Sequence, residues 1–208
     1  MGPERMGGVG AVLADELDRA RALEPDVTRA VLVEGASDRA AVERLAVRLG
    51  RDLRTEGVIV VAIAGATNIG RFLEVLGPSG HDVKLSGLCD RAEAADFAHA
   101  LHRAGIADVV DISNLAAYGF FVCDGDLEEE LIRAVGPTGV LDVIREEGQL
   151  RSFRRFQNQP AQRDKTIEAQ IWRWMGNHKI RYAPLLVEAL DAEALPRPLV
   201  GLLDNIRD

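Results

Sequence analysis

Between residues 29 and 136 the chain repeats one alternation four times: a short apolar run is followed by a segment with helical spacing. The apolar runs lie at 29–35, 57–65, 82–90 and 118–126. Strands that alternate with helices form parallel βαβ units, because a parallel neighbour can only be reached through a crossover connection. Helices then cover both faces of the sheet, so its strands are continuously apolar. We therefore predict an α/β fold with a mainly parallel central sheet of about four strands flanked by helices.

The regions on either side of this alternation are helical in pattern. We predict an N-terminal helix within 1–28, an α/β domain at 29–136 and a helical C-terminal extension at 137–208. A hydrophobic content of 47% is sufficient for a buried core. The longest apolar run is too short to cross a bilayer, and the N-terminus lacks the apolar core of a signal peptide. With only two cysteines, these features indicate a cytoplasmic protein without a membrane partner.

Acidic residues cluster where three of the four predicted strands end. They are Glu34 and Asp38 after the first strand, Asp90, Glu93 and Asp96 after the third, and Asp126 and Glu128 after the fourth. Ligands of open parallel sheets bind beyond the carboxyl ends of the strands, so the three clusters should converge on one rim. Such a group of like charges needs a counter-charge, although each cluster alone is also explained by stabilisation of a helix N-terminus. Carboxylates without histidine or cysteine indicate Mg²⁺ or Mn²⁺, and the number of acids favours two ions.

Positive charge is concentrated in the C-terminal part of the chain. Residues 151–181 hold eight lysines and arginines but two acids, a local charge of +6, which leaves −14 for the rest of a chain of net charge −8. The segment predicts a phosphate-binding face, on which Arg151, Arg154 and Arg155 would contact a nucleic-acid backbone independently of sequence. The alternative is a solvated helical surface. In the same segment Trp172 and Trp174 alternate sides of a predicted helix, so we expect at least one of them in the core.

Four motifs, in this order, resemble those of the TOPRIM (topoisomerase–primase) domain, in the version found in nucleases of the OLD (overcoming lysogenization defect) family. They are "EGASD" after the first strand, "CDRAEAAD" after the third, "GDLEEE" after the fourth, and the later "HKIRYAPLLVEAL". The resemblance implies a Rossmann-like TOPRIM fold and a two-metal site. It implies that Glu34 and Asp90 bind one ion, and that Asp38, Asp126 and Glu128 bind the other, with Glu93 or Asp96 assisting. It also implies that Glu34 and Lys179 are catalytic, Lys179 being the family's catalytic lysine.

The sequence departs from that family in two respects. Ala92 stands where the second acid of the family's D-x-D motif is found, so one metal site is weakened unless Glu93 or Asp96 takes over. OLD nucleases also carry an ATPase ahead of this domain, and the sequence shows none. Its nearest approach to a P-loop, "GATNIGRF", has Arg71 and Phe72 in place of the lysine and hydroxyl residue that bind phosphate and Mg²⁺. We expect a TOPRIM domain without its own ATPase.

The resulting hypothesis is a Mg²⁺- or Mn²⁺-dependent endonuclease that cleaves or nicks DNA; RNA stays open, because a two-metal site contacts phosphates. One alternative is an effector subunit that is active only with a separate ATPase partner. Another is a nucleotidyl transferase of the primase type, which uses the same metals. A plain Rossmann-like nucleotide binder is disfavoured, because no G-x-G-x-x-G follows the first strand.

Overall fold

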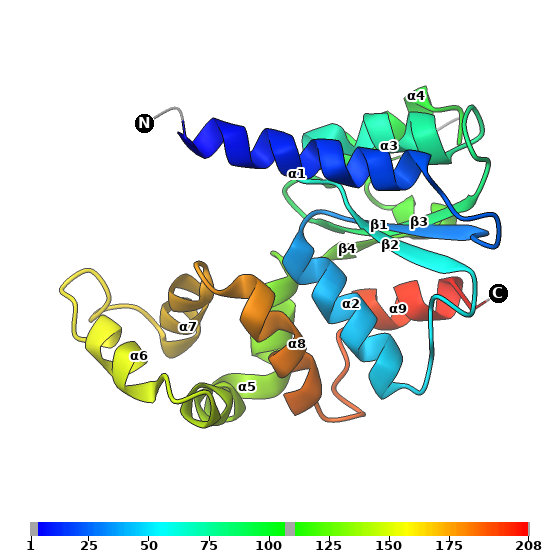
Figure 1. The fold of residues 1–208 in the computed structure, drawn as a ribbon. Coiled ribbons are helices and arrows are strands. Elements are labelled where there is room, and N and C mark those ends of the chain that lie inside the picture. The colour runs from blue at the N-terminus through cyan, green and yellow to red at the C-terminus, as the bar shows by residue number, and fades with distance from the viewer. Residues whose placement is uncertain (1–3, 107–110, 208) are drawn as a thin grey trace.

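A central parallel sheet forms the middle layer of the computed structural model, which describes residues 4–106 and 111–207 (Figure 1). The strands are β1 (Arg29–Val33), β2 (Val58–Ala62), β3 (Lys84–Asp90) and β4 (Phe120–Cys123). Within the described residues they form one four-stranded sheet in the order β2-β1-β3-β4, and every pairing is parallel. The predicted α/β fold with a mainly parallel sheet and flanking helices is confirmed.

The helices form a layer on each face of the sheet. One face is covered by α1 (Glu4–Arg21), α3 (Ile69–Leu76) and α4 (Ala94–Arg103), and the other by α2 (Ala36–Arg48), α5 (Leu127–Glu146), α8 (Lys179–Ala189) and α9 (Arg197–Asn205) (Figure 1). The remaining helices, α6 (Leu150–Gln157) and α7 (Ile167–Met175), extend the second layer by packing on α5. Two short 3₁₀ helices lie at Ala66–Asn68 and Leu115–Tyr118. No helix in the described ranges combines the length and apolar character that crossing a membrane requires.

Strand β1 shows why the apolar runs of the sequence are unbroken. Val31 and Val33 lie in the core shared with the C-terminal helices, whereas Ala30 and Leu32 lie in the core under α1, α3 and α4. Each strand residue therefore meets a helix layer whichever way it points. In the neighbouring β3, a Cβ atom on Gly87 would lie 2.5 Å from the Leu32 oxygen, so this position requires glycine for close packing of the sheet.

Strands β1, β2 and β4 end before the apolar runs that predict them, whereas β3 ends with its run at Asp90. Strand β4 ends at Cys123 because Gly125 adopts a left-handed conformation (φ 94°) and Asp126 then caps α5. Helix α5 itself bends at Gly136 (φ 73°), directly before Pro137, where the sequence pattern becomes wholly helical. Residues 1–3 of the expected N-terminal segment, and residue 208, lie outside the described residues.

Helix α8 packs alongside α2, and their ends show that the two helices run in the same direction. Arg48, the last residue of α2, donates hydrogen bonds to the carbonyl oxygens of Val187 (2.5 Å) and Leu190 at the end of α8. Both helices therefore begin on the same side of the molecule. Lys179, the first residue of α8, is in this way placed next to the turn between β1 and α2.

Candidate metal centre

A cleft of about 490 Å³ opens at the carboxyl ends of the strands. Its lining brings together Glu34 after β1, Asp90 at the end of β3 and Glu128 in the first turn of α5, with Asp38 and Lys179 beside them. The lining is completed by residues 64 and 65 after β2, residues 8 and 12 of α1, and Gly35 and Ser37 at the start of α2. The three acidic strand ends therefore meet in space, as the sheet topology predicts.

The first part of the centre consists of Glu34, Asp90 and Glu93, and we call it the acidic triad. Each offers a carboxylate oxygen, and these oxygens all lie within 4.8 Å of one another. Burial, followed by the proximity of Glu93, Asp90 and Asp38, raises the pKa of Glu34 to about 9. Among the described residues no lysine or arginine forms an ion pair with the triad, although the charge of Lys179 acts on Asp90.

Asp38, and Asp90 of the triad itself, also interact with the acids at the start of α5. Burial and then the charge of Glu128 raise the pKa of Asp38 to about 7, although the Gly35 N–H donates a hydrogen bond to its Oδ2 atom at 2.8 Å. Burial, then Asp126 and Glu93, raise the pKa of Asp90 to about 7. Both aspartates experience acids from two strand ends at once, so the clusters form one electrostatic unit.

The second part of the centre contains a cation. Lys179 Nζ lies 3.0 Å from Glu128 Oε2 and 3.3 Å from Asp126 Oδ2. Burial lowers the pKa of Lys179, but the charges of Glu128 and Asp126 and the hydrogen bonds to them outweigh this and raise the pKa above its ordinary value. We call Asp126, Glu128 and Lys179 the lysine group. It couples the start of α5 to the start of α8.

Within the lysine group the two acids differ in how many of their oxygens are engaged. Asp126 Oδ1 accepts a hydrogen bond from the Glu129 N–H at 2.7 Å. Asp126 Oδ2 accepts one from the Trp172 indole N–H at 2.8 Å and one from Lys179 Nζ at 3.3 Å. Glu128 is only 4% exposed, yet its Oε1 atom has no hydrogen-bond partner in the described part of the chain. Glu128 therefore retains a free ligand atom, whereas Asp126 acts as helix cap and anchor.

Some predicted site residues are not brought into the cleft. Asp96 is exposed in the first turn of α4 and is not part of the acidic triad or of the cleft lining, because it lies one helical turn beyond Glu93. The three arginines Arg151, Arg154 and Arg155 are exposed on α6, which packs against α5 and α7, and they do not line the cleft. Trp172 was missed as a contact of the centre by sequence reasoning, because its partner Asp126 is 46 residues away.

The acidic cluster could hold a divalent metal. Buried carboxylate oxygens without partners are costly unless a proton or a cation meets them. Glu93 Oε2, like Glu128 Oε1, is such an atom among the described residues. A donor set of carboxylates alone is the set preferred by Mg²⁺ and Mn²⁺. The residues present therefore fit a hard divalent ion on the chemistry of their donor atoms.

Comparisons with known proteins agree with the fold. The model of the family "Overcoming lysogenization defect protein-like, TOPRIM domain" matches residues 27–91. The solved C-terminal region of the OLD protein of Xanthomonas campestris pv. campestris is similar at 26% identity and a TM-score of 0.66, over 88% of this chain and 93% of that one. The C-terminal region of the Burkholderia pseudomallei OLD protein, 24% identical over 88% of this chain and 98% of that one, shares the fold at a TM-score of 0.63. No curated protein matches the sequence.

Proposed function

Because this chain carries a TOPRIM domain of the OLD type, we propose that it is a nuclease that uses Mg²⁺ or Mn²⁺ to nick or cleave DNA. The observation that carries the proposal is the convergence of acids from three strand ends on one cleft, with Lys179 as the cation at its wall. Phosphodiester cleavage requires a cationic environment for a phosphate, and carboxylates alone repel one. The acids therefore favour a metal-dependent reaction.

Two subsets of the centre would hold the ions. The acidic triad would hold one, with Glu93 in the place left open by Ala92. Asp38 and Glu128 would hold the other ion. Asp126, whose oxygens accept hydrogen bonds, would mainly position the start of α5 and would be a weaker ligand of this ion. Asp96 would not coordinate either ion. Bound there, the ions would polarise the phosphate and lower the pKa of an attacking water.

Glu34 and Lys179 are the residues whose chemistry we assign. Burial and neighbouring acids raise the pKa of Glu34 to about 9, so Glu34 would lose its proton when a metal ion binds, and metal binding and deprotonation would be linked. Lys179, held protonated by Glu128 and Asp126, would neutralise charge that develops on the phosphate oxygens. In hydrolysis the water oxygen forms a bond to phosphorus, the bond to the leaving oxygen breaks, and the leaving oxygen is protonated.

The nucleic-acid backbone would also be held outside the cleft. Arg151, Arg154 and Arg155 are exposed on α6, and none of them forms an ion pair in the part of the chain that the structure describes. Free surface arginines contact phosphates without reading sequence. DNA is the substrate that we favour, and RNA is tested beside it.

Supercoiled plasmid incubated with the pure protein and Mg²⁺, Mn²⁺ or EDTA tests the proposal. We expect nicking that requires the metal and is lost in Glu34→Gln and Lys179→Met. The matched controls are Glu74→Gln and Lys84→Met, which remove exposed charges of the same types outside the cleft and should nick at the wild-type rate. Equal nicking by Glu34→Gln and wild type would show that the activity comes from another site or a contaminant.

A second candidate is activity only in complex with a partner ATPase. The matched solved structures are described as C-terminal regions of OLD proteins, so in those proteins the region follows another part of the chain. If the wild-type protein cleaves only after such an ATPase is added, it is an effector subunit. Incorporation of labelled nucleotide in the same assay would instead favour nucleotidyl transfer.

A further inference from the structure

The two tryptophans of α7 have opposite environments. Trp174 is 8% exposed and packs edge-on against Phe153 and Tyr182 in the core. Trp172, on the other side of the helix, is 37% exposed. The expectation that at least one of the pair is in the core is confirmed, and Trp172 needs a separate explanation.

Trp172 is fixed by one edge to the metal centre. Its indole N–H donates to Asp126 Oδ2, the same oxygen that Lys179 contacts. The donor edge is thereby anchored at the rim of the centre, while more than a third of the residue stays open to solvent. An aromatic ring held at a fixed angle beside a reaction centre loses little conformational entropy when a flat ligand stacks on it.

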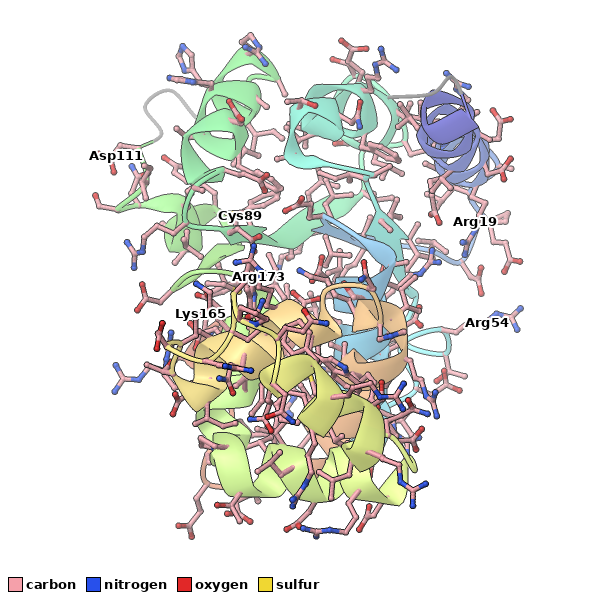
Figure 2. All side chains as sticks on the ribbon, turned by 90° about the vertical axis from the view of Figure 1, so that its left-hand side faces the viewer. Arg19, Arg54, Cys89, Asp111, Lys165 and Arg173 are labelled. Atoms are coloured by element: carbon pink, nitrogen blue, oxygen red, sulfur yellow. The ribbon has the colours of Figure 1, made fainter. Side chains whose placement is uncertain are left out.

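Two cations on the same part of the chain lack ion-pair partners. Lys165, which precedes α7, and Arg173, next to Trp172, are both exposed, and neither forms a salt bridge within the described ranges. Figure 2 looks onto the side where the strands end and shows both residues near the middle of this face, below Cys89, the neighbour of Asp90. Phosphates that approach the centre from this side therefore meet Lys165 and Arg173.

A buried glutamine holds the loop that carries Lys165. Gln170, 7% exposed, donates from its side chain to the carbonyl oxygens of Gln162 (2.7 Å) and Lys165 (3.3 Å), and accepts a hydrogen bond from the Gln157 side chain at 2.7 Å. The backbone of the loop between α6 and α7 is thus tied to the same helix that carries Trp172 and Arg173. An aromatic ring and two cations are presented from one fixed element.

We propose that Trp172 is a stacking platform for an unpaired nucleobase, and that Lys165 and Arg173 contact the phosphates flanking this base. The substrate class is then single-stranded nucleic acid, or a duplex with an unwound segment, and this inference rests on the proposed function. In an intact duplex the faces of the bases are already stacked on one another. The exposed indole of Trp172 can therefore stack on the face of a base only when that base is unpaired. Stacking on aromatic rings together with backbone cations is the usual mode of binding single strands.

Binding of a labelled 12-nucleotide oligothymidine in EDTA tests the proposal without any cleavage. Fluorescence anisotropy gives the affinity, and quenching of tryptophan fluorescence reports stacking; Trp174, which is buried, contributes a constant background. We expect the wild-type protein to be quenched, Trp172→Ala to bind about tenfold more weakly, and Trp172→Phe, which keeps a stacking ring, to stay within about threefold of wild type. Lys165→Ala and Arg173→Ala should each weaken binding and reduce its salt dependence, whereas Arg103→Ala, an exposed charge at the end of α4, should not.

A blunt-ended duplex of 12 base pairs, which has no unpaired base, separates the outcomes. Loss of affinity in Trp172→Ala for the single strand but not for the duplex supports the platform. Equal losses for both ligands, no loss for either, or no binding by the wild-type protein overturns it. The binding assay needs no metal, so its result does not depend on plasmid nicking. Absence of nicking would contradict the proposed function but not the platform. Nicking by the wild-type protein together with normal binding by Trp172→Ala would contradict the platform alone. Matching thermal unfolding of the variants checks that each is folded.

Discussion

The acidic triad and the lysine group both contribute residues to one cleft, but they balance their charges differently. In the triad, Glu34, Asp90 and Glu93 contact one another, and no lysine or arginine of the described residues forms an ion pair with any of them. In the lysine group, Lys179 lies within 3.3 Å of both carboxylates, and a helix N-terminus and an indole N–H satisfy further oxygens.

This difference in charge balance indicates that the two groups have different roles in the site. A cluster that can relieve its repulsion only by taking up protons is incomplete until an external cation arrives. A cluster that contains its own ammonium group is assembled by folding, so it fixes the position of Lys179 before any substrate binds. The acidic triad could therefore hold a metal ion, whereas folding alone positions the charges of the lysine group.

The largest expected effect comes from removing a charge of the triad. Glu34→Gln or Asp90→Asn should lower the nicking rate at least about a hundredfold, because a ligand of the proposed ion is lost. The same variants should raise the free energy of unfolding of the metal-free protein by about 1 kcal/mol, since like-charge repulsion is relieved. Nicking assays and urea titrations in EDTA measure the two effects. A variant that is inactive but destabilised would contradict the description of the triad as uncompensated.

Removing the cation of the lysine group should give the opposite effect on stability. Lys179→Met should lower the rate about 10²–10³-fold and destabilise the protein by about 1–3 kcal/mol, because Glu128 is left buried without a partner. The double variant Lys179→Met/Glu128→Gln should recover stability but not activity. If the single variant is as stable as wild type, Lys179 does not compensate Glu128.

The role of Glu93 in place of the family's second acid can be tested by rescue. Glu93→Gln should weaken Mn²⁺ binding about tenfold, measured by calorimetry. Ala92 is exposed, so an aspartate fits at this position. Ala92→Asp in the Glu93→Gln background should restore much of the affinity. A Glu93→Gln protein that binds Mn²⁺ with wild-type affinity would assign the third ligand elsewhere.

The smallest expected effect is a pH dependence of stability in the absence of metal. Folding raises the pKa of Glu34 from 4.5 to about 9, and the pKa of Asp90 from 3.8 to about 7. The folded state therefore binds protons more tightly than the unfolded state, and this contribution is present below pH 4 and is lost as the pH rises through about 7 to 9. The melting temperature in EDTA should fall by a few degrees between pH 5 and pH 8.5. Saturating Mg²⁺ or the Glu34→Gln variant should flatten this dependence.

The sequence determined the sheet, its strand ends and the identity of most acids of the cleft. Parallel strands all end at one edge, so Glu34, Asp90 and Glu128 had to come together once the alternation of strands and helices was recognised. Periodicity carries this information because the burial of a strand or a helix face is a local property. The sequence did not show whether Glu93 or Asp96 joins the triad. Both follow β3 within one helical turn of each other, and only the path of the chain after β3 decides which side chain lies beside Glu34 and Asp90.

The motifs named Asp126, Glu128 and Lys179, but only the tertiary structure decided the contacts among them and the position of Trp172. Asp126 is joined to Trp172 across 46 residues, and Glu128 to Lys179 across 51. These contacts depend on the directions in which α7 and α8 pack against α5 and α2, and no pattern in a helix specifies the angle at which its neighbour crosses. The packing of α7 and α8 therefore places the Trp172 indole and Lys179 next to the acids at the carboxyl ends of the strands.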